Sequence, residues 1–248
     1  MRVALTLSSL LASSLALGAC NVSEGQEAMS AGSGEAGERS YSVGQFEGVS
    51  LSGSQNVVVT VGEATSVRAE GDTRALDRLE ITVEDGTLKI GQKKNGNWGF
   101  SLGRNLPPTT IYVSTPSLNS AEIGGSGEIS IDRVEGGEFS GSIGGSGDMK
   151  IASLRVANAG FSIAGSGGIS AAGAAENSDV SVAGSGDVDL SGLETQDTSI
   201  AIVGSGDVRA NARRAASVSI MGSGDAHITG TAQCTVKKSG SGDVRCGA

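Results

Sequence analysis

The chain has 248 residues, of which 40 are glycine and only four are Phe, two Tyr and one Trp. Its net charge of −9 argues against nucleic acid as a partner, since nucleic-acid binding proteins carry a basic stripe, and against electrostatic docking on anionic lipid. With so few aromatic residues, the core must be built mainly from Val, Ile, Leu and Ala.

Residues 1–19 have the pattern of a secretory signal peptide. Arg2 precedes an apolar run that is too short to span a membrane. The run ends in Leu17-Gly18-Ala19-Cys20, with leucine where ordinary cleavage requires a small residue. It resembles a bacterial lipobox, which implies that Cys20 becomes the lipidated N-terminus of the protein. Plain secretion, with Cys20 as an ordinary thiol, is the alternative.

A flexible tether is predicted to follow the lipidated cysteine, so that residues 20–42 join the anchor to the folded domain. Residues 21–40 have almost no large apolar side chains and no periodicity. Asn21, rather than Asp, follows the cysteine, and the resemblance to lipoproteins then implies an outer-membrane address. We therefore expect a lipid-anchored protein of the cell envelope, on the periplasmic or the surface face of the outer membrane.

Residues 43–118 form the irregular first part of the predicted domain 43–248. Alternating apolar residues predict short strands, and Arg74–Arg78 predicts one helical turn. We expect these segments to form the first coils, with longer loops, and to cap one end of the regular part that follows. The predicted strands are Val49–Ser52, Val57–Val61, Ser66–Ala69, Leu79–Val83, Thr87–Ile90 and Ile111–Val113.

Residues 119–248 contain a tetrad, mostly Gly-Ser-Gly-Asp, that recurs every 18 to 20 residues. A repeat of this length is typical of a solenoid. We predict an all-β, single-stranded parallel β-helix, right-handed because parallel crossovers almost always are. The tetrads begin at Gly125, Gly145, Gly165, Gly184, Gly204, Gly222 and Gly240.

Apolar residues alternate with small or polar ones on both sides of each tetrad, so we expect a strand, a corner and a second strand with one face buried. Glycine suits the corner because it adopts backbone angles closed to other residues and lets neighbouring coils approach closely. A third inward-facing side is predicted nine residues after the first glycine, at Val134, Leu154, Ala174 and Leu193.

Three segments resemble one known family. They are FEGVSLSGSQNVVVTVGEAT at 46–65, EGDTRALDRLEITVEDGTLKIG at 70–91 and TIYVSTPSLNSAEIGGSGEI at 110–129. Together with the glycine ladder they are similar to the head GIN domain, a bacterial family named as auto-transporter adhesins. The resemblance implies a β-helical fold and a connection with adhesion. It implies no catalytic or binding residues.

The last coil departs from the repeat. Its two inward positions before the tetrad hold Val236 and Lys238, and a lysine there would discourage another chain from adding to the open end. Cys234 and Cys246 are placed six residues before and six residues after Gly240, both on the inward face. In an exported protein they predict a disulfide that clamps the final coil. A reactive cysteine pair is the alternative.

An acidic column is predicted along one edge, because the fourth tetrad position is mostly Asp. If the tetrads stack in register, these carboxylates recur about every 4.8 Å. They could form a cation-binding edge, as in calcium-stabilised repeats, or they could accept backbone N–H bonds at the corner, as Asp often does. We expect the second. The column comprises Glu128, Asp148, Asp187, Asp207, Asp225 and Asp243, interrupted by Gly168.

The sequence contains no recognisable catalytic motif. His227 is the only histidine, so a histidine-based metal site is not expected. The tetrad serines are equivalent members of a repeat, whereas a nucleophile would be one exceptional position. We expect no enzymatic activity, no metal and no cofactor.

The loop at residues 92–106 holds the only tryptophan among several cations. Its aromatic and basic residues predict either an exposed binding loop or a lid in which the aromatic side chains cover the open end of the core. We expect the lid. The candidate residues are Lys93, Lys94, Trp98, Phe100 and Arg104.

The expected function is that of a non-enzymatic, lipid-anchored envelope protein, which presents a rigid β-helical surface for adhesion or assembly. Its expected partners are the membrane, through the N-terminal lipid, and an envelope or extracellular ligand that is a protein or a polysaccharide. The alternatives are a carbohydrate-active β-helical lyase or hydrolase and a calcium-stabilised repeat module.

Overall fold

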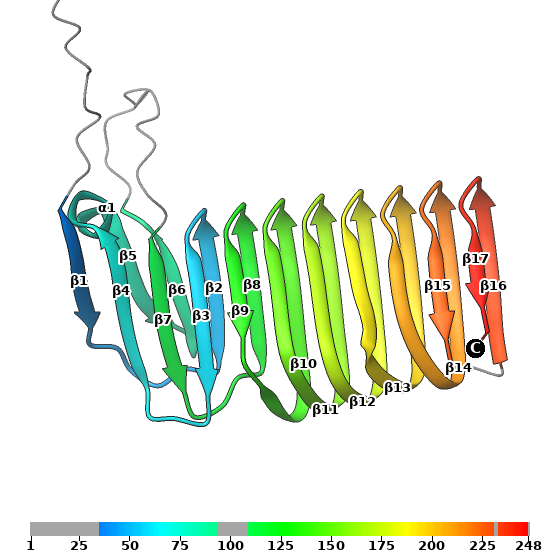
Figure 1. The fold of residues 1–248 in the computed structure, drawn as a ribbon, viewed down its shortest axis with the longest axis horizontal. Helices are drawn as coiled ribbons and strands as arrows, with labels where there is room; N and C mark the ends of the chain where they lie inside the picture. Colours follow the sequence, from blue (N-terminus) through cyan, green and yellow to red (C-terminus); the bar gives the residue numbers. More distant parts are fainter. Residues whose placement is uncertain (1–34, 94–108, 231–232, 248) are drawn as a thin grey trace, which may run out of the picture. The chain divides into compact units, whose positions relative to one another are not determined.

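The computed structural model describes residues 35–93, 109–230 and 233–247, which lie in one compact unit, Ser33–Ala248. Strands dominate this unit and lie side by side in a long stack (Figure 1). The predicted signal peptide, Cys20 and most of the predicted tether fall outside the described residues. Among the described residues, no helix has the length and apolar character needed to cross a membrane.

The regular coils form the parallel β-helix that the repeat predicts. Each strand pairs in parallel with its equivalent in the next coil, and the first glycines of successive tetrads are register partners from Gly125 to Gly240. The strands are β8 (Ser120–Gly125), β9 (Glu128–Ile131), β10 (Val134–Gly145), β11 (Asp148–Gly165), β12 (Gly168–Gly184), β13 (Asp187–Gly204), β14 (Val208–Gly222), β15 (Ala226–Thr229), β16 (Gln233–Gly240) and β17 (Val244–Cys246).

The corner glycines are required by backbone angle and by space. Gly204 has φ +134°, a region that side-chain-bearing residues rarely adopt. A Cβ atom at Gly204 would also overlap the carbonyl oxygen of Gly184 in the preceding coil. The same two conditions recur at the other first glycines, which explains why this position is invariant along the ladder.

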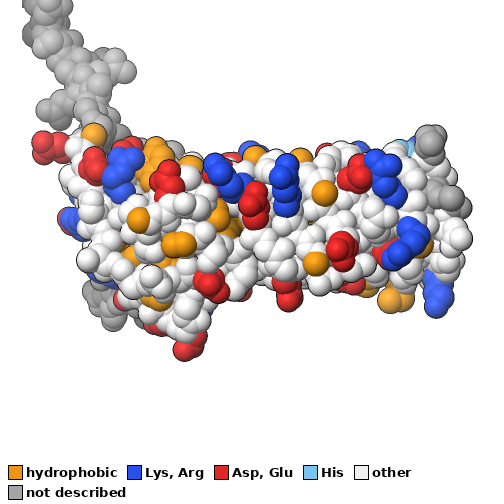
Figure 2. Space-filling model, turned by 90° about the horizontal axis from the view of Figure 1, so that it is seen from below, with side chains coloured by type: hydrophobic (Ala, Val, Ile, Leu, Met, Phe, Trp, Pro, Cys, Tyr) orange, Lys and Arg blue, Asp and Glu red, His pale blue; other side chains and the backbone are white. Residues whose placement is uncertain are grey.

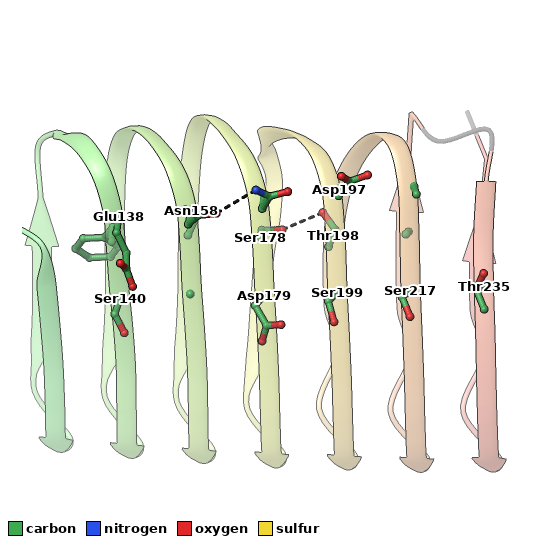
Figure 3. A pocket seen from close by; sticks show the side chains of 16 residues that line it. Glu138, Ser140, Asn158, Ser178, Asp179, Asp197, Thr198, Ser199, Ser217 and Thr235 are labelled. Carbon is green, nitrogen blue, oxygen red and sulfur yellow. Dashed lines mark hydrogen bonds between the residues drawn. The ribbon is translucent and has the colours of Figure 1, made fainter.

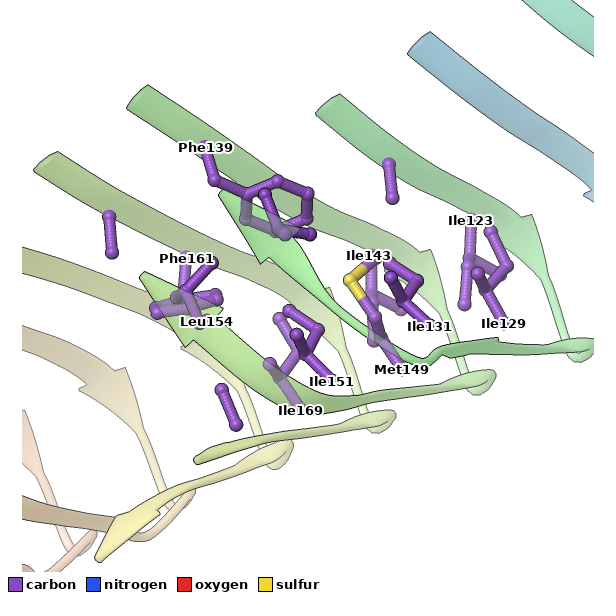
Figure 4. Close-up of a cluster of buried hydrophobic side chains, with 14 of the residues drawn as sticks. Ile123, Ile129, Ile131, Phe139, Ile143, Met149, Ile151, Leu154, Phe161 and Ile169 are labelled. Atoms are coloured by element: carbon purple, nitrogen blue, oxygen red, sulfur yellow. The ribbon is translucent and has the colours of Figure 1, made fainter. Parts of the chain in front are cut away.

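The core runs through the coils as one cluster of buried, mostly aliphatic side chains, and Figure 4 shows part of it. Residues that flank the tetrads alternate between buried and exposed, as in Val180, Ser181 and Val182. The predicted third side is also buried at Val134, Leu154 and Leu193.

The prediction for Ala174 is wrong, because Ala174 is exposed and Gly173 occupies the slot between Leu154 and Leu193. The coil that starts at Gly165 is one residue shorter than its two predecessors, and the register shifts by one residue before this slot. The neighbouring Ala175 is buried instead.

The N-terminal end of the stack does not follow chain order. The coil made by β2 (Gly48–Gly53) and β3 (Asn56–Val61) lies between two later coils. On one side it pairs with β6 (Thr87–Gln92) and β7 (Thr110–Thr115), and on the other with β8 and β9. The first predicted coil is therefore not the outermost one.

Antiparallel strands complete this end. β4 (Ser66–Asp72) pairs with β7, β5 (Leu79–Glu84) pairs with β6, and the predicted helical turn is α1 (Thr73–Arg78). Asp72 caps α1, since its Oδ1 accepts the Arg74 N–H at 2.9 Å.

Part of the predicted tether is folded, so the boundary at residue 42 is wrong. β1 (Ala36–Tyr41) pairs antiparallel with the outer edge of β4. A strand can pair with an open edge through backbone hydrogen bonds alone, without large apolar side chains. The polar sequence of β1 therefore gives no signal from which a strand could be predicted. Tyr41 packs against the core, and Arg39 forms an ion pair with Asp77 at 2.6 Å.

At the C-terminal end the inward positions of the last coil are open. Val236 is 45% exposed, and Lys238 Nζ donates a hydrogen bond to the Gly242 carbonyl oxygen at 2.6 Å. Cys234 packs against the core, and Cys246 is the register partner of the buried Ile228, so both cysteines occupy inward positions as predicted. Cys246 is nevertheless exposed, because no further coil covers this end in the described part of the chain. The Cα atoms of the two cysteines lie 6.5 Å apart, within the range of a disulfide, and the pairing stays a prediction.

Candidate binding groove

The predicted acidic column lies in register along the corner edge, with Gly168 between Asp148 and Asp187. Toward the C-terminal end its carboxylates accept backbone N–H bonds from the next coil. Asp187 Oδ1 accepts from Asp207 N at 2.9 Å, Asp207 Oδ1 from Asp225 N at 3.0 Å, and Asp225 Oδ1 from Asp243 N at 2.7 Å.

These aspartates accept backbone N–H bonds, as expected, and each of these hydrogen bonds joins one coil to the next. Among the described residues, no group of three or more His, Cys, Asp and Glu side chains is placed to hold a metal ion.

We expect Asp207→Ala to lower the free energy of unfolding by about 1 kcal/mol, because the Asp225 N–H loses its acceptor. Asp207→Asn keeps a carbonyl oxygen at this place and should retain most of the stability. Asp148→Ala is the matched control, since the N–H of the next corner, at Gly168, bonds to the Gly147 carbonyl oxygen instead. Urea unfolding measures the three differences, and equal effects of Asp207→Ala and Asp148→Ala would contradict the role of the Asp207 carboxylate.

Glu128, the first acid of the column, forms an ion pair with Lys150 Nζ at 2.9 Å and also accepts a hydrogen bond from Ser130 Oγ at 3.1 Å. The bond from Lys150, followed by that from Ser130, lowers the pKa of the Glu128 carboxyl, and desolvation opposes them. A carboxyl whose pKa is lower in the folded state stabilises the fold above its unfolded pKa. This contribution is lost as the pH falls through the folded pKa.

We therefore expect Lys150→Met to lower stability at neutral pH and to lose this effect in acid, where Glu128 is protonated in wild type and variant alike. The effect should be small, since the Glu128 and Lys150 side chains are 37% and 61% exposed. Melting curves of the two proteins from pH 7 to pH 3 would show the difference. A gap between the melting temperatures that persists in acid would contradict the assignment to this pair.

Of the predicted binding loop, the structure describes Lys93 alone among the candidate residues. Lys93 Nζ donates to the Asp77 carbonyl oxygen at 2.8 Å. Lys94, Trp98, Phe100 and Arg104 lie outside the described residues, so the choice between lid and binding loop stays open. His227 lies between Arg209 and Arg245 in register on the outer face.

A different surface feature crosses the regular coils. It is a groove of about 630 Å³, which we call the polar groove, on the outer face of strands β10, β11, β12, β13, β14 and β16 (Figure 3). With neighbouring strands about 4.8 Å apart, its length is roughly 24 Å. One wall carries Glu138, Asn158, Asn177 and Asp197, and the other carries Ser140, Gly160, Asp179, Ser199, Ser217 and Thr235.

The floor of the polar groove is buried and internally satisfied. Ser178 and Thr198 are 5% and 4% exposed, and their hydroxyl oxygens lie 2.9 Å apart. The Thr198 hydroxyl also contacts that of Thr195 at 2.7 Å, and Thr195 donates to the Asn211 carbonyl oxygen at 2.9 Å. This chain of hydroxyl groups holds the floor in place beneath the walls.

The first wall is held partly by side-chain contacts between coils. Asn177 Nδ2 donates to Asn158 Oδ1 at 3.0 Å, and Arg214 Nε donates to Asp197 Oδ1 at 2.8 Å. The hydrogen bond from Arg214 lowers the pKa of the Asp197 carboxyl. Figure 2 shows acidic and basic side chains interspersed along one face of the stack.

Two carboxylates of the polar groove remain available to a ligand. Within the described part of the chain, neither Glu138 nor Asp179 has a hydrogen-bond or ion-pair partner, and both are exposed. On the first wall, the Asn158 amide keeps its N–H donors and the Asn177 amide keeps its oxygen acceptor. The groove thus offers charges, donors and acceptors from successive strands.

None of the polar-groove residues is among the sequence-predicted site residues. One signal could have found them: Asn158 and Asn177 recur at equivalent positions 19 residues apart, next to Glu138 and Asp197. Each residue alone is an ordinary polar surface residue, and the concave shape follows only from the closed coil.

The fold and the groove define a class of protein: a parallel β-helix whose regular coils carry a polar groove on their outer face. A family model described as "Putative auto-transporter adhesin, head GIN domain" matches residues 45–232, and the chain belongs to this family. The family predicted from the sequence is thereby confirmed. A search of curated proteins finds no match.

Several solved structures share the fold. A putative adhesin from Bacteroides fragilis is 21% identical with a TM-score of 0.77, covering 86% of this chain and 97% of that one. A putative lipid binding protein from Parabacteroides distasonis is 21% identical with a TM-score of 0.68, covering 88% and 98%. A putative adhesin from Parabacteroides merdae is 18% identical with a TM-score of 0.65, covering 88% and 98%. At these identities the likeness shows the fold alone.

Proposed function

We propose that the chain is a non-enzymatic, lipid-anchored protein of the cell envelope that presents its β-helical surface for adhesion or assembly. The observation that carries this proposal is the polar groove, whose walls come from successive strands of one hydrogen-bonded stack. A surface built on paired strands keeps its shape without a ligand, which favours binding because little conformational entropy is lost. Membership of a family named for adhesion supports the same function.

The anchor in this proposal is Cys20, with the lipid holding the chain in the outer membrane. Cys20→Ser should release the chain from the membrane fraction of cells into the soluble fraction. The wild-type chain should partition into detergent and carry the mass of the lipid. A chain that stays membrane-bound after the substitution would contradict anchoring through Cys20.

Adhesion to external surfaces requires that the β-helix be exposed on the cell. We expect protease added to intact cells to digest the full-length chain as readily as protease added to lysed cells. A periplasmic marker protein should survive in the intact cells and serves as the control. Protection of the chain alongside the marker would contradict adhesion outside the cell and leave assembly within the envelope.

A further inference from the structure

We infer that the polar groove binds an uncharged, hydroxyl-rich polysaccharide that lies along the stack and crosses several coils. This inference rests on the proposed function and names the class of ligand. Its first basis is geometric. The groove is open at the surface and runs across six strands in register, so a polymer with a regular repeat can meet similar groups on one coil after another.

The hydrogen-bonding groups of the groove match hydroxyl groups. A sugar hydroxyl donates one hydrogen bond and accepts others, so it needs both kinds of partner. Glu138 and Asp179 supply acceptors, Asn158 supplies donors, and Asn177 supplies an acceptor beside it. Hydrogen bonds to the charged carboxylates would be the stronger ones.

Charge restricts the ligand further. The two carboxylates without partners, together with the net charge of −9, disfavour an acidic polymer. Arg214, the cation beside the groove, is already bonded to Asp197. An uncharged polymer meets no such repulsion.

A peptide strand is a poorer occupant of this place. Peptides that extend a sheet bind at an open edge through backbone hydrogen bonds. The polar groove lies on the face of the sheet, where the backbone groups of β11, β12 and β13 are already paired with neighbouring strands on both sides. Recognition here must use side chains, and the side chains available are hydroxyl, amide and carboxylate groups.

Glycine at position 160 gives a direct way to fill the groove. Within the described residues, the one atom less than 4 Å from a Cβ placed there is the Phe139 carbonyl oxygen, at 3.9 Å, and the backbone is not in the left-handed region. Gly160→Ile should therefore fold, since β-branched residues suit strands, and it should obstruct the groove where the groove crosses β11, between Ser140 and Asp179. Gly144 has the same surroundings, with the Ile123 carbonyl oxygen at 3.9 Å, and lies outside the groove. Gly144→Ile is the matched control.

The experiment measures retardation of the full chain in native gels that contain one soluble polysaccharide each: dextran, mannan or a mixed-linkage glucan as neutral polymers, and alginate as an acidic one. We expect at least one neutral polymer to retard the protein and alginate not to do so. Gly160→Ile should weaken the binding at least tenfold, and Gly144→Ile should leave it unchanged. Equal melting temperatures of the two variants would show that both are folded.

A second pair of variants tests the carboxylate independently of the filled groove. Asp179→Ala should weaken binding several-fold, whereas Glu135→Ala, which removes an exposed acid outside the groove, should not. Retardation by alginate alone, by none of the polymers, or by a neutral polymer equally in Gly160→Ile would overturn the inference. Binding of phosphatidylcholine vesicles in place of the neutral polymers would also overturn it. The proposed function and the assigned ligand can fail separately. If the chain is exposed on cells and mediates attachment, and Gly160→Ile leaves this attachment unchanged, then the proposed function is supported and the assignment of a polysaccharide to the groove is wrong.

Discussion

Replacing Gly204 by alanine is expected to lower the free energy of unfolding by about 4 kcal/mol. The backbone at Gly204 has φ +134°, and a non-glycine residue in such a region costs on the order of 1–3 kcal/mol. The added Cβ also overlaps the Gly184 carbonyl oxygen of the coil below, and overpacking of this kind costs about 1–3 kcal/mol more. The two neighbouring coils would have to move apart to make room.

The control for this prediction is Gly144→Ala in the same kind of strand. Gly144 has ordinary backbone angles, and its nearest atom to an added Cβ is 3.9 Å away, so this substitution should change stability by less than about 1 kcal/mol. Urea unfolding followed by circular dichroism would compare the two. If Gly204→Ala were no less stable than Gly144→Ala, close approach of the corners would not be what selects glycine there.

Replacing Phe139 by alanine is the second change with a large expected effect, about 3–5 kcal/mol of lost stability. Phe139 is fully buried, and its ring centroid lies 6.4 Å from that of Phe161 in the next coil. Gly141 faces this space, and a Cβ there would lie 2.9 Å from Met149 Sδ. The aromatic rings thus fill volume that the coil leaves empty at Gly141.

Two further variants serve as controls for Phe139→Ala. Phe139→Leu keeps most of the side-chain volume and should lose much less stability than Phe139→Ala. Val203→Ala removes methyl groups from a side chain that is 52% exposed and should be nearly neutral. A loss that is the same for Phe139→Leu and Phe139→Ala would mean that ring contact with Phe161, rather than filled volume, stabilises this part of the core.

The regular coils could be predicted from the sequence because two local signals coincide there. Glycine recurs where the backbone has an angle that other residues avoid, and buried apolar residues lie on both sides of it, as Ile202 and Val208 do around Gly204. The misplaced Ala174 shows the limit of counting from the glycine. One residue fewer in a single coil moves the inward slot to Gly173, and a shift of one residue exchanges the two faces of a strand.

The order of the N-terminal coils could not be predicted, because strands β2, β6 and β8 have similar alternating apolar patterns. Which of them become neighbours depends on contacts between residues far apart in the chain, such as Leu51 with Ile90 and with Ile123. β1 could not be predicted because its sequence lacks the alternating apolar pattern that β2, β6 and β8 share. Its pairing with β4 is made by backbone hydrogen bonds, which do not require apolar side chains.

The polar groove could not be predicted because its walls are ordinary surface residues. Asn158 and Asp179 come from adjacent coils, and only the closed turn of each coil brings them to the same concave strip. The sequence shows that these side chains are polar, but only the stacking of the coils places them next to one another.

The placement of β2 and β3 between later coils affects the order in which the protein folds and unfolds. During synthesis, which starts at the N-terminus, the β2–β3 coil has no partner on either side until residues 87–131 have been made. The N-terminal end of the stack must therefore assemble as one block of about half the domain. The coils beyond it can then be added one at a time, in the order of synthesis. Mechanical pulling from the C-terminus should reverse this order, giving a series of small, even steps and then one large final rupture.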